Sequence, residues 1–379
     1  MESILVVSAS QDKTIKLWRC PKKVCNFENV GNLRSLVEVF KFLSQKEVIG
    51  LGRVSKKYYE ASFHCELGNR TLKLRKVQSL KGHTGGVVMA VFSKSKKFIV
   101  SASEDKTIRI WNLATGLQTH LLEAECKFLC VSISGDDELV VSGDDQGLIR
   151  VWSLESQKVI SVLEGHTGWV LSVAISSSKE FIVSGSADRT VRVWNLNSGE
   201  HIKKLEGHMD YTYCVAISSN DKFIVSGGFD NTVRVWDLSS GEQTKVFYNH
   251  SFFVYSVVIS SKDDFVVSSS ADKTVRILDL SSGQETQVFQ GHNGVVLSAA
   301  LSNDGKYIVS GGDRGDCSIR VWDTQKNQQL QVLQAHTSSV HSIDLIELPL
   351  RDLNKAKPKK RPIAQKNAKL TKKPKLSYD

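Results

Sequence analysis

No stretch of this 379-residue chain is apolar for long enough to span a membrane, although 41% of its residues are hydrophobic. A membrane helix needs about 20 consecutive apolar residues, so we expect no membrane partner. The amino-terminal sequence MESILVVSASQDK lacks the basic region and small-residue cleavage site of a secretory signal. The seven cysteines include no Cys-x-x-Cys pair, which favours reduced thiols in the nucleus or cytoplasm over disulfides or a metal site.

Net charge is almost absent from the first 350 residues. The whole chain carries a net charge of +10, and residues 351–379 alone hold nine Lys, two Arg and two Asp. We interpret residues 347–379 as a disordered basic tail, because such a composition cannot bury a core. The run KPKKRP resembles a nuclear import signal, so an import receptor or nucleic acid is a candidate partner there, and a solubilising tail is the alternative.

A repeated unit fills residues 74–346. Residues 165–196 show its form, GHTGWVLSVAISSSKEFIVSGSADRTVRVWNL, with a Gly-His opening, three strand-like runs and a closing Trp-Asn. Counted from Trp to Trp, with Leu278 in place of the fifth Trp, the spacings from Trp111 to Trp322 are 41 to 44 residues. A period near 40 residues with four strand-like segments is typical of a β-propeller blade. These residues therefore predict six complete blades and one additional strand, 340–346.

The two ends of the chain complement each other. Residues 1–19 contain two strand-like runs, 4–10 and 14–19, without a first strand before them, whereas strand 340–346 has none after it. We predict an all-β, seven-bladed propeller closed by the two termini. Its seventh blade combines these three strands with residues 74–80. This closure would remove two open sheet edges.

These repeats resemble those of the WD-repeat family. In that family a loop His, a Ser of the second strand, an Asp of the next turn and the Trp form a hydrogen-bonded tetrad. Positions 28, 10 and 6 before each Trp, with a two-residue insertion in the sixth blade, select four such sets, and a fifth spans the two termini. The sets are His83, Ser101, Asp105, Trp111; His166, Ser184, Asp188, Trp194; His208, Ser226, Asp230, Trp236; His292, Ser310, Asp316, Trp322; and His336, Ser8, Asp12, Trp18.

Two blades depart from this pattern. The second has Ala124 and Gln146 where His and Asp belong, and the fifth has Leu278 for Trp. We expect these blades to be the least tightly tied. Ser, His and Asp are also the residues of a hydrolase triad, but five copies beside an indole that needs a partner favour a structural network. The sequence contains no paired carboxylates or metal-ligand spacing, so we expect no catalysis, no cofactor and no metal site.

Aromatic side chains recur at one face of the predicted ring. The position three residues after the loop His lies at this face, and it is Gly86 in the first blade but Trp169, Tyr211 and Phe253 in three consecutive blades. Because small residues serve at this position elsewhere, packing does not require a ring there. We predict that these residues bind a protein substrate or peptide, and half-buried packing is the alternative. The predicted partner-binding residues are Trp169, Tyr211, Tyr213, Phe229, Phe253 and Tyr255.

Residues 20–73 interrupt the repeat and have a helical period. Apolar residues including Leu36, Val37, Phe40 and Leu43 share one helical face, and Ser44-Gln-Lys-Glu47 is a capping box that begins a second helix. This small α-helical module resembles an F-box, which docks substrate receptors onto ubiquitin ligases, although Gly31-Asn-Leu33 replaces the usual Leu-Pro opening. The resemblance implies that Leu36, Val37, Phe40 and Leu43 contact the ligase adaptor. Helices that only pack on the propeller are the alternative.

The sequence therefore favours a non-catalytic protein-interaction propeller of the nucleus or cytoplasm. Its most specific form is the substrate-recognition subunit of an SCF-type ubiquitin ligase, in which the helical module binds the adaptor and the propeller holds the substrate. A plain WD-repeat scaffold of a nuclear or cytoplasmic complex is the first alternative. An RNA-associated nuclear propeller that uses its basic tail is the second.

Overall fold

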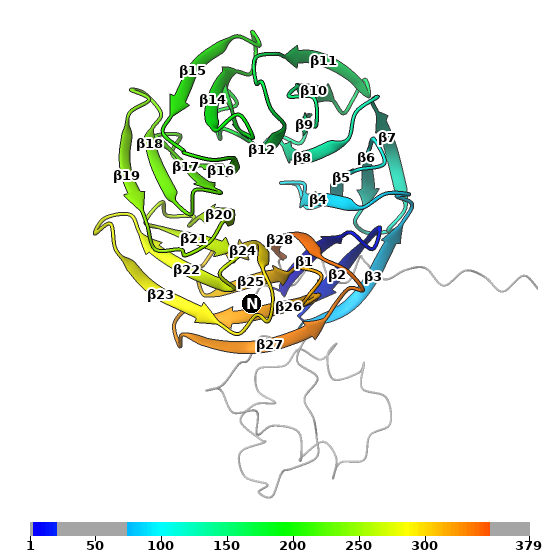
Figure 1. Ribbon diagram of the computed structural model, residues 1–379. Helices are drawn as coiled ribbons and strands as arrows, with labels where there is room; N and C mark the ends of the chain where they lie inside the picture. Colours follow the sequence, from blue (N-terminus) through cyan, green and yellow to red (C-terminus); the bar gives the residue numbers. More distant parts are fainter. Residues whose placement is uncertain (1–2, 21–73, 349–379) are drawn as a thin grey trace, which may run out of the picture.

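Seven four-stranded antiparallel sheets are arranged in a ring (Figure 1). The computed structural model describes residues 3–20 and 74–348. Blades 1 to 3 comprise β4 (Val87–Phe92), β5 (Phe98–Ser103), β6 (Thr107–Asn112), β7 (Gln118–Glu123); β8 (Phe128–Ile133), β9 (Leu139–Asp144), β10 (Ile149–Ser153), β11 (Lys158–Leu163); and β12 (Val170–Ile175), β13 (Phe181–Ser186), β14 (Thr190–Asn195), β15 (His201–Glu206). The prediction of an all-β, seven-bladed propeller is confirmed.

The remaining blades follow the same plan. Blades 4 to 6 comprise β16 (Thr212–Ile217), β17 (Phe223–Gly228), β18 (Val233–Asp237), β19 (Gln243–Phe247); β20 (Val254–Ile259), β21 (Phe265–Ser270), β22 (Thr274–Asp279), β23 (Glu285–Gln290); and β24 (Val296–Leu301), β25 (Tyr307–Gly312), β26 (Ser318–Asp323), β27 (Gln328–Gln334). Blade 7 has the strand order β28 (Val340–Leu348), β1 (Ser3–Ser10), β2 (Thr14–Arg19) and β3 (Arg75–Lys81).

Burial falls from the middle of each blade to its outer edge. In blade 3, five of the six residues of β13 are buried, whereas the outermost strand β15 is mostly exposed. The second strands do not alternate between buried and exposed residues, because both of their faces are covered by neighbouring blades. The core accordingly lies between the blades. Trp236 of blade 4, for example, packs with Val183, Val191 and Leu205 of blade 3.

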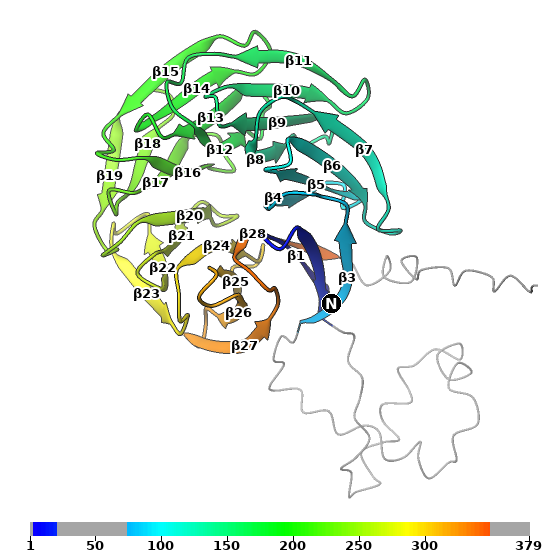
Figure 2. The same cartoon turned by 45° about the vertical axis from the view of Figure 1, so that its right-hand side comes forward.

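Blade 7 joins the two ends of the described chain. Val6 of β1 pairs with Leu345 of β28 on one side and with Trp18 of β2 on the other. Strand β3 completes the sheet, with Leu17 opposite Gln78, and Figure 2 shows β28 and β1 side by side with β3 farther out in the same blade. Strand β1 is therefore paired on both sides, and the two ends of the described chain close the ring as the sequence predicts.

Aspartates on the short turns between first and second strands tie some blades together. Asp137 of blade 2 accepts the backbone N–H groups of Lys94 and Ser95 of blade 1, at 2.7 and 2.8 Å. Asp221 and Asp263 form the same bracket between blades 3 and 4 and between blades 4 and 5. Each of these contacts satisfies two backbone donors with one charged acceptor, which makes strong hydrogen bonds.

The predicted helical insertion lies outside the described residues, together with its Leu36, Val37, Phe40 and Leu43, and so does the tail beyond residue 348. Residues 3–20 and 74–348 contain strands and turns but no helix. Accordingly, none of the described residues belongs to a helix that could cross a membrane.

Candidate binding surface at the loop face of the ring

Hydrogen-bonded tetrads hold one face of the ring in place. In blade 1 the indole N–H of Trp111 donates to Ser101 Oγ at 2.8 Å, and Ser101 Oγ lies 2.8 Å from His83 Nε2. On the other side of the imidazole, His83 Nδ1 lies 2.8 Å from Asp105 Oδ2. These contacts are all satisfied when the neutral imidazole donates from Nδ1 to Asp105 and accepts the hydroxyl proton at Nε2. Equivalent contacts join the predicted residues of blades 3, 4 and 6.

The same tetrad spans the joint of blade 7. Ser8 Oγ lies 2.8 Å from His336 Nε2 and accepts the indole N–H of Trp18 at 2.9 Å. His336 Nδ1 in turn lies 2.9 Å from Asp12 Oδ2. The joint is thus fastened by side chains from both ends of the described chain as well as by the β1–β28 ladder.

Burial and charge set the protonation of these groups. Burial lowers the pKa of His83 and of His336 below the ordinary value, despite the opposing effect of the neighbouring aspartate. Burial alone would raise the pKa of Asp12, but hydrogen bonds from His336 and Thr14 outweigh it and hold this pKa well below its usual range. A neutral histidine beside an ionised aspartate is therefore the resting state.

A threonine two residues after the turn aspartate extends most tetrads, and sequence reasoning missed it. Thr107 Oγ1 donates to Asp105 at 2.6 Å, and Thr190 Oγ1 donates to Asp188 at 2.6 Å. The signal was available as the recurring Asp-x-Thr of the turns. Because each serine is buried and each aspartate is already bonded, the Ser-His-Asp sets are closed structural networks without an accessible nucleophile.

Blade 2 replaces the tetrad with a buried ion pair. Its Trp152 still donates to Ser142 at 2.8 Å, but Asp144, which is fully buried, pairs with Arg150. The guanidinium of Arg150 also donates to Cys126 Sγ at 3.1 Å, and burial together with Asp144 raises the pKa of the Cys126 thiol to about 12. The blade that the sequence marks as incomplete therefore has a substitute network of its own.

Blade 5 keeps three of the four tetrad members. His250 Nε2 lies 2.8 Å from Ser268 Oγ, and His250 Nδ1 lies 2.8 Å from Asp272. Leu278 occupies the position of the Trp and is completely buried. Sequence reasoning did not single out this set, although the offsets of 28, 10 and 6 residues, counted back from Leu278, identify it.

We call the face of the ring that carries the loop histidines and the turn aspartates the loop face. Seven pairs of positions form its rim. In each blade, the residue that follows the second strand donates its backbone N–H to the carbonyl of the residue that precedes the first strand. The acceptor is the loop position that the sequence predicts at this face. In blade 4 Phe229 N donates to Tyr211 O at 2.9 Å, and in blade 1 Glu104 N donates to Gly86 O at 3.0 Å. From blade 1 to blade 7 the pairs are Gly86 and Glu104, Lys127 and Asp145, Trp169 and Ala187, Tyr211 and Phe229, Phe253 and Ala271, Val295 and Asp313, Ser339 and Gln11.

Five of the six predicted aromatic residues form one stacked cluster, and Phe229 is its centre. The Phe229 ring stacks on Phe253 at 4.4 Å, on Tyr213 at 5.1 Å and on Tyr211 at 5.8 Å between centroids. Tyr255 meets Phe229 and Tyr213 edge to face, at 5.4 and 4.8 Å. We call these five residues the aromatic cluster. Such offset and edge-to-face contacts stabilise the rings against one another.

The cluster is partly accessible, and other exposed apolar residues lie next to it in sequence. Tyr211 and Phe253 are exposed, whereas Tyr213, Phe229 and Tyr255 are half-buried. Burial raises the pKa of Tyr213 above that of an ordinary phenol. Met209 and Phe252, on the same two loops, are 77% and 57% exposed. Packing therefore accounts for the half-buried members of the cluster, and binding stays a prediction for the exposed ones.

Trp169 lies apart from the aromatic cluster. It belongs to the neighbouring blade 3, its side chain is 54% exposed, and no aromatic ring of the described chain stacks on it. Its backbone carbonyl accepts Ala187 N at 2.9 Å, so the loop is held while the indole projects outward. An exposed indole on a fixed loop is a common anchor in protein recognition.

The ends of the two described segments, at residues 3, 20, 74 and 348, lie on the opposite face. Strand β28 begins beside the rim residue Ser339 and runs away from it, β1 returns, and β2 runs away again. Cys20, at the end of β2, and the end of β28 are therefore remote from the aromatic cluster. The loop face is built entirely from described residues. These residues contain no group of His, Cys, Asp and Glu that could hold a metal ion.

Comparison with known proteins agrees with this architecture. The family described as "WD domain, G-beta repeat" matches residues 74–112, 116–153, 157–195, 199–237, 241–279 and 283–323. Each match begins with the outer strand of one blade and ends with the third strand of the next. Six repeats in sequence therefore contribute strands to all seven blades.

Individual relatives are diverse. The chain is 27% identical to autophagy-related protein 16 of Arabidopsis thaliana over 168 residues, which cover 44% of this chain and 31% of that protein. It is 28% identical to nuclear distribution protein nudF of Aspergillus niger over 167 residues, 44% of this chain and 36% of the relative. A guanine nucleotide-binding protein subunit beta of Zea mays is 29% identical over 25% of this chain and 27% of its own length. The matched part thus spans little more than a third of these relatives at most. The family repeats cover more than half of this chain and show that it belongs to the WD-repeat family.

Proposed function

We propose that this protein is a non-catalytic interaction propeller that binds a segment of a protein partner on its loop face. The observation that carries the proposal is the aromatic cluster together with Trp169, on three consecutive blades. At the same repeat position, other blades have Gly86, Val295 or Ser339. Exposed aromatic side chains that the fold does not require are typical of binding hot spots.

Site-specific photo-cross-linking tests this proposal. A photoreactive phenylalanine analogue at Phe253 or Trp169 should cross-link a partner segment in cells, whereas the same analogue at Ile160 on the outer strand β11, which is 56% exposed, should not. The cross-linked segment is then synthesised, and its affinity is measured by calorimetry. Trp169→Ala and Tyr211→Ala should each weaken binding by about 2 kcal/mol. Equal cross-linking from Ile160, or unchanged affinity of the double variant, would place the site elsewhere.

We further propose that the partner is a substrate presented to an SCF-type ubiquitin ligase. The support is the F-box-like sequence of residues 33–62, which lies outside the described residues. Leu36→Glu or Leu43→Glu should abolish recovery of the ligase adaptor while substrate binding through Trp169 survives. If the helices are only structural, the wild-type protein should recover no adaptor, and the same charges should lower the melting temperature.

Two other functions are distinguished by the same experiments. A plain scaffold of a nuclear or cytoplasmic complex would bind its partners through the aromatic cluster but recover no adaptor. An RNA-associated propeller would lose nucleic-acid binding when residues 351–379 are removed, because that segment carries nine of the ten net positive charges.

A further inference from the structure

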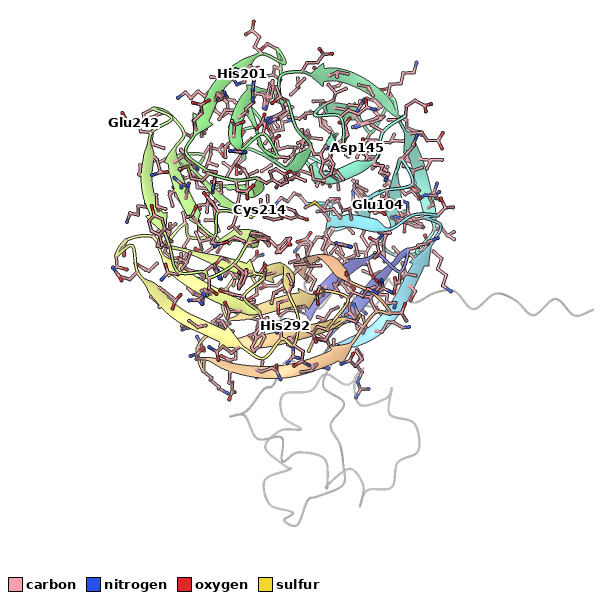
Figure 3. The ribbon with its side chains drawn as sticks, viewed as in Figure 1. Glu104, Asp145, His201, Cys214, Glu242 and His292 are labelled. Carbon is pink, nitrogen blue, oxygen red and sulfur yellow. The ribbon has the colours of Figure 1, made fainter. Side chains whose placement is uncertain are left out.

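Three of the four blades outside the aromatic ones have a carboxylate at the rim. Glu104, Asp145 and Asp313 occupy the rim position that follows the second strand in blades 1, 2 and 6, and Phe229 holds this position in blade 4. Figure 3 shows Glu104 and Asp145 on neighbouring blades, nearer the middle of the ring than Glu242, which lies at its circumference. The loop face thus has an aromatic side and an acidic side.

None of these three carboxylates is neutralised by a cation within the described part of the chain. Glu104 accepts the side-chain amide of Gln11 at 3.0 Å. Asp145 accepts the backbone N–H of Lys127 at 3.2 Å, and Asp313 accepts that of Gly315 at 3.0 Å. The nearby side chain of Lys127 forms no ion pair with Asp145 among the described contacts. The turn aspartates of the tetrads, in contrast, are bonded to histidines.

The two sides of the loop face are contiguous. The pKa of Tyr255 in the aromatic cluster is raised by burial and also by the negative charge of Asp313. Burial lowers the pKa of His341 of blade 7, and the negative charge of Glu104 opposes this effect; the His341 ring lies 3.0 Å from Gln11. The carboxylate of Asp313 therefore lies close enough to the aromatic cluster to act on one of its members.

Building on the proposed function, we infer that the loop face binds a protein segment in which Lys or Arg lies close to an apolar side chain. The apolar group packs on Tyr211 and Phe253, and the carboxylates of Glu104, Asp145 and Asp313 on the same face attract the cation. Aromatic faces and carboxylates both attract cations, and the methylene stem of Lys or Arg can cover an aromatic ring while its charged head stays in water. Unpaired carboxylates at a binding rim also repel acidic partners.

A peptide array tests this chemistry. The full-length protein is applied to an array of short random peptides, and the binders are resynthesised for fluorescence anisotropy. Binders should be enriched in Lys or Arg next to an apolar residue. Replacing Arg with citrulline, which keeps its shape but removes its charge, should weaken binding by about fivefold or more. Affinity should also fall as NaCl rises from about 0.05 to 0.5 M.

Variants then separate the contributions of charge and aromatic surface. The double variant Glu104→Gln, Asp145→Asn should lose about fivefold in affinity for the Arg peptide but not for the citrulline peptide. Glu242→Gln, the matched control at the circumference, should change neither. Phe253→Ala should weaken both peptides.

Three results would overturn the inference. Binders that depend on Phe253 but show no basic preference would leave the proposed function standing and refute this inference alone. If no peptide depends on Phe253, the proposed function fails and the inference fails with it. Binding seen only after removal of residues 351–379 would assign the surface to the chain's own basic segment instead of an external partner.

Discussion

Ser8 and His336 are 328 positions apart in sequence, yet their side chains lie 2.8 Å from each other inside one blade. Ser8 Oγ is completely buried, so this contact exists only when β28 and β1 are paired. The equivalent contact in blade 4, between His208 and Ser226, spans 18 positions. The same network therefore has a local role in most blades and a ring-closing role in blade 7.

Deletion of residues 1–19 should disrupt the ring. It removes β1 and β2, separates β28 from β3 and leaves the core residues of blades 6 and 1 uncovered. We expect loss of cooperative thermal unfolding and aggregation through the bared strands, measured by circular dichroism and light scattering. A soluble truncated protein with unchanged melting would contradict closure by these strands.

Alanine variants of Trp169 and Phe229 should distinguish the contribution of a side chain to partner binding from its contribution to the free energy of unfolding. Because the Trp169 side chain is exposed and outside the aromatic cluster, Trp169→Ala should change the free energy of unfolding by less than about 0.5 kcal/mol while weakening partner binding. Phe229→Ala removes the centre of five rings and should cost about 1 to 3 kcal/mol of stability as well. Chemical denaturation and calorimetry measure both. Equal stability loss in the two variants would mean that Trp169 is a packing residue.

Arg150 should matter more for stability than its counterpart Arg109. Arg150→Met leaves the buried carboxylate of Asp144 without its cation and should destabilise the protein by about 3 kcal/mol or more. Arg109→Met, the matched control in blade 1, loses hydrogen bonds to Gln118 and Thr107 and should cost about 1 kcal/mol. Urea denaturation distinguishes them. Similar losses would show that Asp144 is satisfied without Arg150.

Blade 5 offers a double-variant test of tetrad packing. A Cβ atom added at Gly207, which precedes His208, would lie 2.9 Å from the ring of Trp236, so a side chain at this position crowds the Trp ring. Blade 5 has Asn249 in place of that glycine and Leu278 in place of the Trp. We expect Leu278→Trp alone to cost about 1 to 3 kcal/mol of stability, because the larger ring meets Asn249.

Asn249→Gly should offset most of that cost. The measurement is a double-mutant cycle by urea denaturation, with an expected coupling of about 1 kcal/mol or more between the two positions. Additive effects would show that residue 249 does not contact the ring. The occurrence of Asn249 together with Leu278 in blade 5 would then have no explanation in packing.

Stability should fall in two stages as the pH is lowered. The pKa values of His83, His166, His292 and His336 are lowered in the folded state, so below the ordinary value of 6.5 the unfolded chain binds more protons and the fold loses stability. The tetrad aspartates also have lowered pKa values, and their contribution is lost as the pH falls below about 4. Urea midpoints between pH 8 and pH 3 (about one value per half unit) measure this. His83→Asn should make the first fall shallower, and a midpoint that rises on acidification would contradict the scheme.

Much of the ring could be predicted because its signals are local and repeated. Each Trp sets an origin from which the same offsets reach the residues that the structure joins by hydrogen bonds, and the strand ranges expected for blade 7 differ from those observed by at most two residues. His250 was overlooked because Leu278 removed the Trp from which the offset is counted. The Asp144–Arg150 pair was overlooked because it replaces the tetrad with different chemistry at different positions.

The surface was harder to predict than the core. The repeat places Tyr211, Phe229 and Phe253 at one face, but only the structure shows that Phe229 is the shared neighbour and that Trp169 stands apart. Nor does the repeat reveal that Glu104, Asp145 and Asp313 stand at the same position as Phe229, because side chains at a rim are not constrained by the period of the core.

The joint of blade 7 also determines when this protein can finish folding during synthesis. Strands β1 and β2 leave the ribosome early, but their partner β28 and His336 follow 328 residues after Ser8. At about 5 to 20 residues per second, translation of that interval takes roughly 15 to 65 seconds. Throughout that time the edge of β1 that pairs with β28, together with Val6, lacks its native partner, and an unpaired strand edge is prone to aggregation until β28 is made.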